Sequence, residues 1–453
     1  MEGDILINST LAYCRACGRS EMARIVARRG GVFMERMCRK GIASVKIAND
    51  YKWYMERMSY SEAAAPRPAA GKKLKGCPND CGPCAMHAGG LRLPVFSITN
   101  DCNLDCPKCF TYNRPDKKYY KSVADTKKII KEIIRLSGGV QVMNLTGGEP
   151  TLHPELGKII KACRHKKIGR ITMNTNGLRL ARDPGLAAEL KSLGVQAVLS
   201  VDTFNPAKSR RIAGRDVTAE KRKALEALEK HGVPTTILST CIKDVNDAEV
   251  AGIAREYIAR DFMRSVTIQN MTFTGRNGEN FKPRRHITID EVESLLEKAG
   301  PFSREDFFPL GGYHPLCYSV AYYLHNAGRL TPLARLADKR KLSAAASGGY
   351  LPRPSGELAR EMLDGINRLW AEGGDAAELQ ALRKRAMTFQ AGDTVPEEHI
   401  RAVYIHPHMD EDNFDIDRVS RCGDLVPDEK GRMVPACSYN LLYRQKDPRF
   451  WIE

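Results

Sequence analysis

The sequence predicts an α/β protein whose centre is a partial (β/α)6 barrel of the TIM type, with cysteine-rich extensions at both ends. The barrel follows from six short apolar, β-branched runs that alternate with helical patterns between Leu93 and Thr274. The extensions follow from 14 cysteines that fall mostly in tight groups. Strands that alternate with helices form a parallel sheet through right-handed crossovers, and such barrels carry their chemistry at the carboxyl ends of the strands.

Each predicted barrel element has its own sequence pattern. The expected strands cover residues 93–99, 140–146, 170–175, 197–203, 234–242 and 264–272. The expected helices have apolar residues at three-to-four spacing and cover residues 127–136, 155–164, 185–193, 219–228 and 248–258. Four regions follow: a small cysteine-knuckle domain at 1–60, a linker with further cysteines at 61–92, the barrel at 93–280, and a helical C-terminal region with cysteines at 281–453.

Composition and charge limit the class of protein. A chain of 453 residues with a hydrophobic fraction of 42% can fill a sizeable core. The first residues have no basic, apolar leader pattern and no stretch is apolar for long enough to span a membrane, so we expect a cytoplasmic protein. Thiols stay reduced there, and clustered cysteines then indicate metal ligands. The net charge of +17 favours an anionic partner, namely nucleic acid, a phosphorylated substrate or a membrane surface.

Three cysteines on one loop carry the main chemical signal. Cys102, Cys106 and Cys109 follow directly after the first predicted barrel strand. A 4Fe–4S cluster has four iron corners, each usually held by a thiolate, so three thiols leave one iron open. An open iron binds a small molecule and passes it an electron, whereas a structural zinc knuckle does neither. We therefore predict a cluster with a vacant corner at the mouth of the barrel.

This C-x3-C-x2-C loop after a first barrel strand resembles the radical S-adenosylmethionine (radical SAM) superfamily. The resemblance implies that the open iron chelates the amino and carboxylate groups of SAM, and that an electron from the cluster cleaves SAM to methionine and a 5′-deoxyadenosyl radical, which abstracts a hydrogen atom. It implies cofactor contacts at the ends of the next strands, from Gly147, Gly148, Glu149, Pro150, Asn174, Asn176, Ser200 and Asp202. The residue before the third cysteine, often aromatic in the superfamily, is Lys108, which leaves adenine stacking to Phe110 or Tyr112.

The outer cysteines form three further groups of three. Cys77, Cys81 and Cys84 lie shortly before the barrel. Cys14, Cys17 and Cys38 lie near the N-terminus, and Cys317, Cys422 and Cys437 lie downstream of the barrel. A C-x2-C knuckle with a third cysteine suits a mononuclear iron or zinc site, and a purely structural role is as well supported there as a redox one. Cys163 and Cys241 fall within a predicted helix and a predicted strand and are expected to be core residues.

The groups together resemble one branch of the superfamily, the tetraether lipid synthases and their pterin-methylating relatives. The stretches that carry this resemblance are CPNDCGPCAMH, TNDCNLDCPKCF, LTGGEPTLHP, HPLCYS, HMDEDNFDIDRVSRC and VPACSYNLLYR. It implies one or two auxiliary 4Fe–4S clusters, one of them on Cys317 and the tail cysteines, and a rubredoxin-like mononuclear iron, or zinc, at the N-terminal knuckle. A further thiol expected near Gly312 is missing, which implies a histidine ligand such as His314, an open iron or a lost cluster.

Three functions remain open from the sequence. The first, slightly preferred, is carbon–carbon bond formation on lipid hydrocarbon chains, that is, a transferase of lipid biosynthesis; the second is radical methylation of a pterin or another small molecule. The expected partners are a small-molecule or lipid substrate and an electron donor such as ferredoxin or flavodoxin. Arg-bearing helices in 355–389 suit a solvated face or, as the less favoured interpretation, peripheral membrane association. The third is a non-catalytic iron–sulfur nucleic-acid-binding protein, although no nucleic acid is expected because aromatic-interleaved basic motifs are missing.

Overall fold

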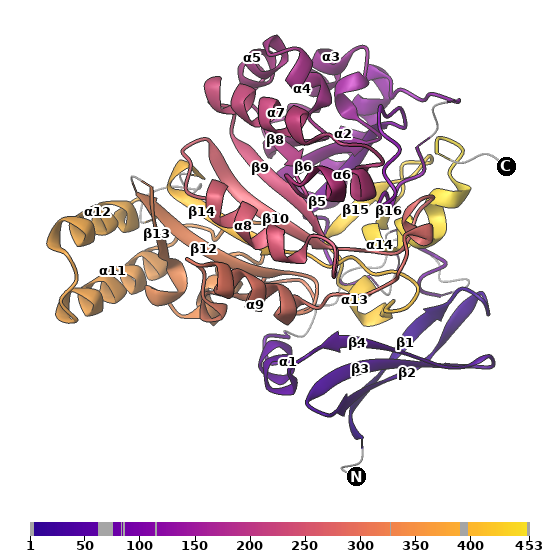
Figure 1. Ribbon diagram of the computed structural model, residues 1–453, viewed down its shortest axis with the longest axis horizontal. Coiled ribbons are helices and arrows are strands. Elements are labelled where there is room, and N and C mark those ends of the chain that lie inside the picture. Colours follow the sequence, from indigo (N-terminus) through magenta and orange to yellow (C-terminus); the bar gives the residue numbers. More distant parts are fainter. Residues whose placement is uncertain are drawn as a thin grey trace.

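The computed structural model describes residues 4–61, 76–82, 84, 87–113, 116–326, 328–389 and 397–450. Most of the predicted Ala/Pro/Lys linker, residues 62–75, lies outside the described residues. The described chain folds into a four-stranded N-terminal sheet and a large mixed sheet that forms the barrel (Figure 1).

The N-terminal sheet is a meander of four antiparallel strands. It contains β1 (Ile5–Cys14), β2 (Arg19–Arg28), β3 (Gly31–Cys38) and β4 (Gly41–Ala48), in that order, and is followed by α1 (Tyr51–Met58). Asp50 caps α1 by accepting hydrogen bonds from the N–H groups of Lys52 and Trp53. Glu293, buried in α9, accepts hydrogen bonds from the Trp53 indole at 2.7 Å and the Arg57 guanidinium at 2.5 Å. These buried bonds fix the sheet and its helix to the side of the barrel.

Six consecutive parallel strands form the barrel wall. They are β5 (Leu93–Thr99), β6 (Val140–Gly147), β7 (Ile168–Thr175), β8 (Val195–Ser200), β9 (Thr235–Cys241) and β10 (Met263–Asn270). The helices are α2 (Val123–Ser137), α3 (Leu156–Cys163), α4 (Leu178–Arg182), α5 (Gly185–Ser192), α6 (Pro206–Ala213), α7 (Thr218–Lys230), α8 (Asp247–Tyr257) and α9 (Ile289–Ala299). The predicted α/β fold class with a partial (β/α)6 barrel is therefore confirmed.

The C-terminal part of the chain extends the barrel sheet at both edges. On one side β14 (Ile400–Ile405) pairs parallel to β10, and β12 (Ser319–Asn326) pairs antiparallel to β14. On the other side β15 (Asp424–Pro427) pairs parallel to β5 and antiparallel to β16 (Met433–Pro435). Short strands β11 (Phe308–Pro309) and β13 (Arg329–Pro332) flank β12. Residues 281–453 therefore supply strands as well as helices, and the barrel strands β5 and β10 are not edges.

The C-terminal helices are α10 (Lys339–Ala345), α11 (Gly356–Ala371), α12 (Ala376–Met387), α13 (Ile416–Ser420) and α14 (Ala436–Ser438). Helix α11 buries Leu358, Met362 and Ile366 in a core shared with β12 and β14. Its apolar side is thus occupied within the protein, which leaves its charged side to solvent. Within the described ranges, no helix combines the length and the apolar character that crossing a bilayer requires.

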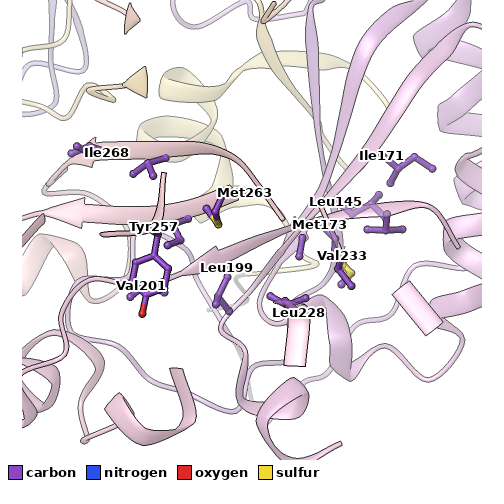
Figure 2. Close-up of a cluster of buried hydrophobic side chains, with 14 of the residues drawn as sticks. Leu145, Ile171, Met173, Leu199, Val201, Leu228, Val233, Tyr257, Met263 and Ile268 are labelled. Carbon is purple, nitrogen blue, oxygen red and sulfur yellow. The ribbon is translucent and has the colours of Figure 1, made fainter. Parts of the chain in front are cut away.

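The main core lies between the barrel strands and the helices around them. Figure 2 shows part of it, where Leu145, Met173 and Leu199 from successive strands lie near Leu228 of α7 and Tyr257 of α8. Cys163 and Cys241 are fully buried in this core, which confirms their expected role. Because side chains alternate along each strand, the other face points into the barrel.

Candidate functional site

The predicted cysteine loop lies where β5 ends, at the mouth of the barrel. Cys102, Cys106 and Cys109 line one open cavity of about 1120 Å³, so the loop brings the three thiols to one site. Burial raises the pKa of the Cys102 thiol, and raises that of Cys106 to about 12. Thiols in this state ligate iron only when the metal displaces their protons, so cluster binding here is coupled to proton release.

Most of the predicted cofactor residues line the same cavity. These are Phe110, Gly147, Gly148, Glu149, Asn174, Asn176, Ser200 and Asp202. Two predicted residues do not: Pro150 is buried at the start of a short 3-10 turn, Pro150–Leu152, and Tyr112 is buried away from the cavity. The ends of β6, β7 and β8 therefore converge on the thiol loop, as parallel strands require.

The paired glycines allow β6 to lie against the loop after β5. Gly147 has a φ of +137°, and a Cβ there would lie 2.0 Å from the carbonyl oxygen of Thr99. A Cβ on Gly148 would lie 2.2 Å from the carbonyl oxygen of Asp101. Both contacts are backbone contacts that no side-chain movement relieves. Glycine is needed here to bring the two strand ends together.

Glu149 holds the turn after β7. Its Oε1 accepts hydrogen bonds from the Thr151 N–H at 3.1 Å, the Thr151 hydroxyl at 2.6 Å and the Thr175 hydroxyl at 2.8 Å. Its Oε2 accepts one from the Asn176 N–H at 2.6 Å. The sequence suggests this carboxylate as a partner for an ammonium group. The structure adds that four protein donors already fix its position, which is 1% exposed.

Two lysines place positive charge beside the thiols. Lys108 donates to Asp202 at 2.5 Å and to the Thr240 hydroxyl at 2.9 Å, so the departure from an aromatic residue creates an ion pair between the cysteine loop and the end of β8. Lys221 of α7 is buried and donates to the Asn176 carbonyl at 2.5 Å, and burial lowers its pKa. Both line the cavity, where they suit a carboxylate or another anionic group.

The sequence analysis did not identify Lys221, although a signal for it exists. Lys221 shares a helix face with Ala224, Leu225 and Leu228, which are all buried, whereas Lys223 is exposed. A lysine in the apolar phase of an amphipathic helix is costly to bury without a partner. The phase of the helix therefore distinguishes Lys221 from its basic neighbours.

The N-terminal cysteines form a compact group. The sulfur atoms of Cys14, Cys17 and Cys38 lie within 4.8 Å of one another, and a hydrogen bond with Cys14 raises the pKa of Cys17 to about 11. Thiolates on one tetrahedral zinc or iron ion, each about 2.3 Å from it, lie about 3.8 Å apart, so a group gathered this closely suits a single ion. Among the described residues the group contains no histidine or acidic ligand, and Gly41 stands where a second C-x2-C knuckle would end.

The downstream cysteines Cys317, Cys422 and Cys437 line a second, smaller cavity of about 340 Å³. Burial raises the pKa of all three thiols, that of Cys437 to about 12. His314, the proposed replacement ligand, does not line this cavity, and its Nδ1 accepts the Leu316 N–H at 3.2 Å. A different histidine does line it, His408, whose Nδ1 lies 3.7 Å from the sulfur of Cys437. Three thiols that line one cavity suit an iron–sulfur cluster.

The upstream group Cys77, Cys81 and Cys84 lies between the N-terminal sheet and the tail. The Cys77 carbonyl accepts a hydrogen bond from the Ser20 hydroxyl at 2.9 Å, and the Cys81 N–H donates to the Tyr443 hydroxyl at 2.9 Å. A hydrogen bond with Cys77 lowers the pKa of Cys81. Cys77 and Cys81 therefore contact segments that are distant from them in the chain, the N-terminal sheet and the tail.

A third cavity, of about 1260 Å³, occupies the barrel interior next to the thiol site. Five side-chain amides line it, from Asn144, Asn174, Gln196, Gln269 and Asn440, together with an aromatic wall that includes Tyr318, Tyr350 and Tyr404. This cavity and the cavity of the cysteine loop share Phe110, Thr111, Thr146, Gly147, Asn174, Leu238, Gln269 and His408. A molecule in the barrel therefore lies directly beside the cofactor site.

Comparison with known proteins gives one domain match and several relatives. Residues 96–257 match the Radical SAM superfamily. The chain is 26% identical to the 7,8-dihydro-6-hydroxymethylpterin dimethyltransferase of Methanocaldococcus jannaschii, over 96% of this chain and 94% of that protein. It is 31% identical to a probable GTP 3′,8-cyclase of Pyrococcus abyssi, over 35% of this chain and 51% of that protein.

Solved structures match over smaller parts. SuiB of Streptococcus suis bound to S-adenosylmethionine matches with a TM-score of 0.39 and 21% identity, over 46% of this chain and 47% of that one. Methylornithine synthase (PylB) matches with a TM-score of 0.37 and 14% identity, over 65% of this chain and 86% of that one.

Proposed function

The chain belongs to the radical SAM superfamily and is a radical SAM enzyme, and from this premise we propose that it methylates a small planar nitrogen heterocycle of the pterin class inside the barrel. When bound, the cluster and S-adenosylmethionine supply a radical that removes a hydrogen atom from an unactivated carbon. Cys102, Cys106 and Cys109 would hold the cluster, and the cavity around them would hold the cofactor. The non-catalytic alternative is set aside because the chain is an enzyme.

The lining of the barrel cavity carries this proposal. Asn144 donates to Thr172 and Asn174, and Gln196 donates to Thr236, each at 2.8 or 2.9 Å. Three side-chain groups border the cavity and have no hydrogen-bond partner among the described residues. They are Asn144 Oδ1, Gln196 Oε1 and the NH₂ group of Asn174. A flat heterocycle with donor and acceptor edges satisfies these groups, while the tyrosine wall contacts its face.

A hydrocarbon chain fits this lining less well. Leaving a buried amide group without a partner costs about 1–3 kcal/mol, and a lipid tail in this cavity offers no partner to the unpaired groups of Asn144, Asn174 and Gln196. The lipid substrate preferred from the sequence therefore becomes the alternative. The full-length similarity to a pterin dimethyltransferase supports the same choice.

The test is a product assay on the anaerobically reconstituted enzyme. The enzyme is incubated with dithionite and methyl-deuterated S-adenosylmethionine, together with 6-hydroxymethyl-7,8-dihydropterin or an isoprenoid lipid. We expect 5′-deoxyadenosine and a methylated pterin, and the deuterium shows whether the cofactor supplies the methyl group. Hydrogen loss from the lipid with an unchanged pterin would reject the proposal.

A matched pair of variants tests the cavity itself. Gln196→Leu removes an amide from the barrel interior, and Gln380→Leu removes one from the exposed surface of α12. Losing hydrogen bonds worth about 1.4 kcal/mol weakens pterin binding about tenfold, and only Gln196→Leu should show this. Equal pterin affinity in both variants would contradict binding at the amides.

A further inference from the structure

An exposed apolar row crosses all four strands of the N-terminal sheet. Leu11 pairs with Met22, and Met37 pairs with Ile42. Ala23 pairs with Arg36, which places Met22 and Met37 in the next row and so aligns the four side chains on one face. Leu11, Met22 and Ile42 are 41%, 50% and 64% exposed. Large apolar side chains gathered on one exposed face indicate a surface for a partner.

The row borders the N-terminal thiols. Strand β1 runs from Leu11 to Cys14, and β3 ends with Met37 and Cys38. Cys17 and Cys38 are half-buried, so the thiol group is close to the surface. Because side chains alternate along a strand, Cys14 and Cys38 point to the face opposite Leu11 and Met37, so a protein docked on the row is separated from the thiol site by the thickness of the sheet.

Basic residues surround the row and the thiols. Arg39 and Lys40 form the exposed turn between β3 and β4, and no ion pair engages them among the described residues. Arg15 and Arg19 flank the other turn and are paired with Glu279 and Glu21. An apolar centre with a cationic rim, on a chain of net charge +17, is complementary to an acidic partner.

Side chains in contact lead inward from the thiols. Tyr13, next to Cys14, packs edge-to-face on Phe414 with ring centroids 6.2 Å apart, and both lie in a buried cluster that includes Cys437. The sulfur of Cys437 lies 3.7 Å from His408 Nδ1, and the His408 ring lies 5.9 Å from that of Phe110, the neighbour of Cys109. His408 borders the barrel cavity, the cofactor cavity and the cavity of the downstream cysteines.

We propose that the row of Leu11, Met22, Met37 and Ile42 is the docking site of an acidic, low-potential one-electron carrier protein. One electron would leave the carrier, which is oxidised, and pass by way of the iron that the N-terminal thiols would hold and the cluster that Cys437 would help to hold. It would reach the cluster on Cys102, Cys106 and Cys109, which is reduced by one electron. No bond forms or breaks and no proton moves along the way. The proposal rests on the radical SAM chemistry, which consumes one electron for each cofactor cleaved, and is independent of the substrate.

The experiment compares two reductants on the holoenzyme. Reduced acidic ferredoxin is the probe carrier, and dithionite, a small ion, bypasses docking. The double variant Met22→Glu with Ile42→Glu adds negative charge to the row, and Met387→Glu, at a residue that is also 50% exposed, is the control on α12. We expect the double variant to lose at least tenfold in kcat/KM for ferredoxin-driven 5′-deoxyadenosine formation and to keep the dithionite-driven rate. The control should keep both rates.

A binding measurement supports the kinetics. Titration of oxidised ferredoxin into the holoenzyme should give an affinity that falls with added salt and is weaker for the double variant. Equal ferredoxin affinity in wild type and double variant, or a loss of both reductant-driven rates together, would overturn the proposal. A chain that is dimeric in solution and becomes monomeric in the double variant would assign the row to a second copy instead, and would overturn it too.

Loading the N-terminal site with zinc in place of iron tests the path separately. Zinc has no redox chemistry, so the zinc form should bind ferredoxin normally while its clusters are reduced at least tenfold more slowly, as followed by EPR. Equal reduction rates in the iron and zinc forms would remove the thiol site from the path.

Discussion

Replacing Glu149 by Gln tests how the cofactor cavity is built. The carboxylate accepts four hydrogen bonds, two from the hydroxyls of Thr151 and Thr175 and two from the backbone N–H groups of Thr151 and Asn176. A glutamine has one acceptor oxygen and one NH₂ group. Hydroxyls rotate to accept from the NH₂ group, but a backbone N–H does not. Whichever way the amide is oriented, one of the two N–H groups therefore loses its partner.

The cost can be worked from these contacts. A buried N–H without a partner costs about 1–3 kcal/mol, and hydrogen bonds to a neutral acceptor are about half as strong as those to a carboxylate. The sum is about 3 kcal/mol, carried by the turn that contains Asn176. If SAM binding has to restore that turn, its Kd rises about a hundredfold.

The assay is calorimetric titration of SAM into anaerobically reconstituted protein, with urea denaturation of the same samples. Glu155→Gln is the matched control, because Glu155 follows a few residues later and pairs with Lys158 at the exposed start of α3. We expect no change in SAM affinity or stability for the control. Equal SAM affinity in the two variants would show that Glu149 does not hold the turn, and the account of the cavity would then be wrong.

Three further predictions follow from other contacts. Gly148→Ala should abolish SAM binding and lower the urea midpoint, because the added Cβ meets the Asp101 carbonyl. The control is Gly373→Ala, whose added Cβ has no atom within 4 Å; it should change the urea midpoint less and leave SAM binding intact. Lys221→Met should keep the urea midpoint, since methionine suits the apolar face of α7, but should weaken SAM binding at least about tenfold; a large loss of stability would contradict this. Burial disfavours the charged form of His286, but the hydrogen bond and charge of Asp410 outweigh burial and raise the pKa of the histidine. His286 therefore stabilises the fold fully below its unfolded pKa of about 6.5, and this contribution is lost as the pH rises through its folded pKa. The urea midpoints of wild type and His286→Gln should therefore converge with rising pH, and a constant difference would refute the assignment.

The barrel was predictable because its signals are local. The predicted strand 93–99 matches β5, and five predicted helices correspond to α2, α3, α5, α7 and α8. Three helices of this part were not predicted. Helix α4 has only five residues, α6 has few apolar residues besides Ile212, and α9 was missed although its apolar residues recur at three-to-four spacing. The C-terminal strands β12, β14 and β15 were not predicted either, since their partners lie far away in the sequence.

The candidate site residues that belong to a recognisable sequence motif were predictable. The cysteine loop, the paired glycines and the strand-end polar residues all line the cavity that the sequence anticipates. His408 and Gln269 were missed because only the folded barrel brings them beside Phe110, and no local pattern distinguishes them. His314 was chosen from its closeness to Cys317 in the sequence, but the cavity of Cys317 is bordered by His408 instead.

The pairing of β15 with β5 has a consequence for how the protein is made. Leu93 and Pro94, at the start of the barrel, lie in register with Asp424 and Leu425, so ribosomes must have added more than 300 residues before this side of the sheet can close. Until then, the loop that should receive iron stands on a strand with one unsatisfied side. A barrel with both edges of β5 covered therefore exists only after β15 has been translated, and a chain truncated before β15 should keep one edge of β5 open.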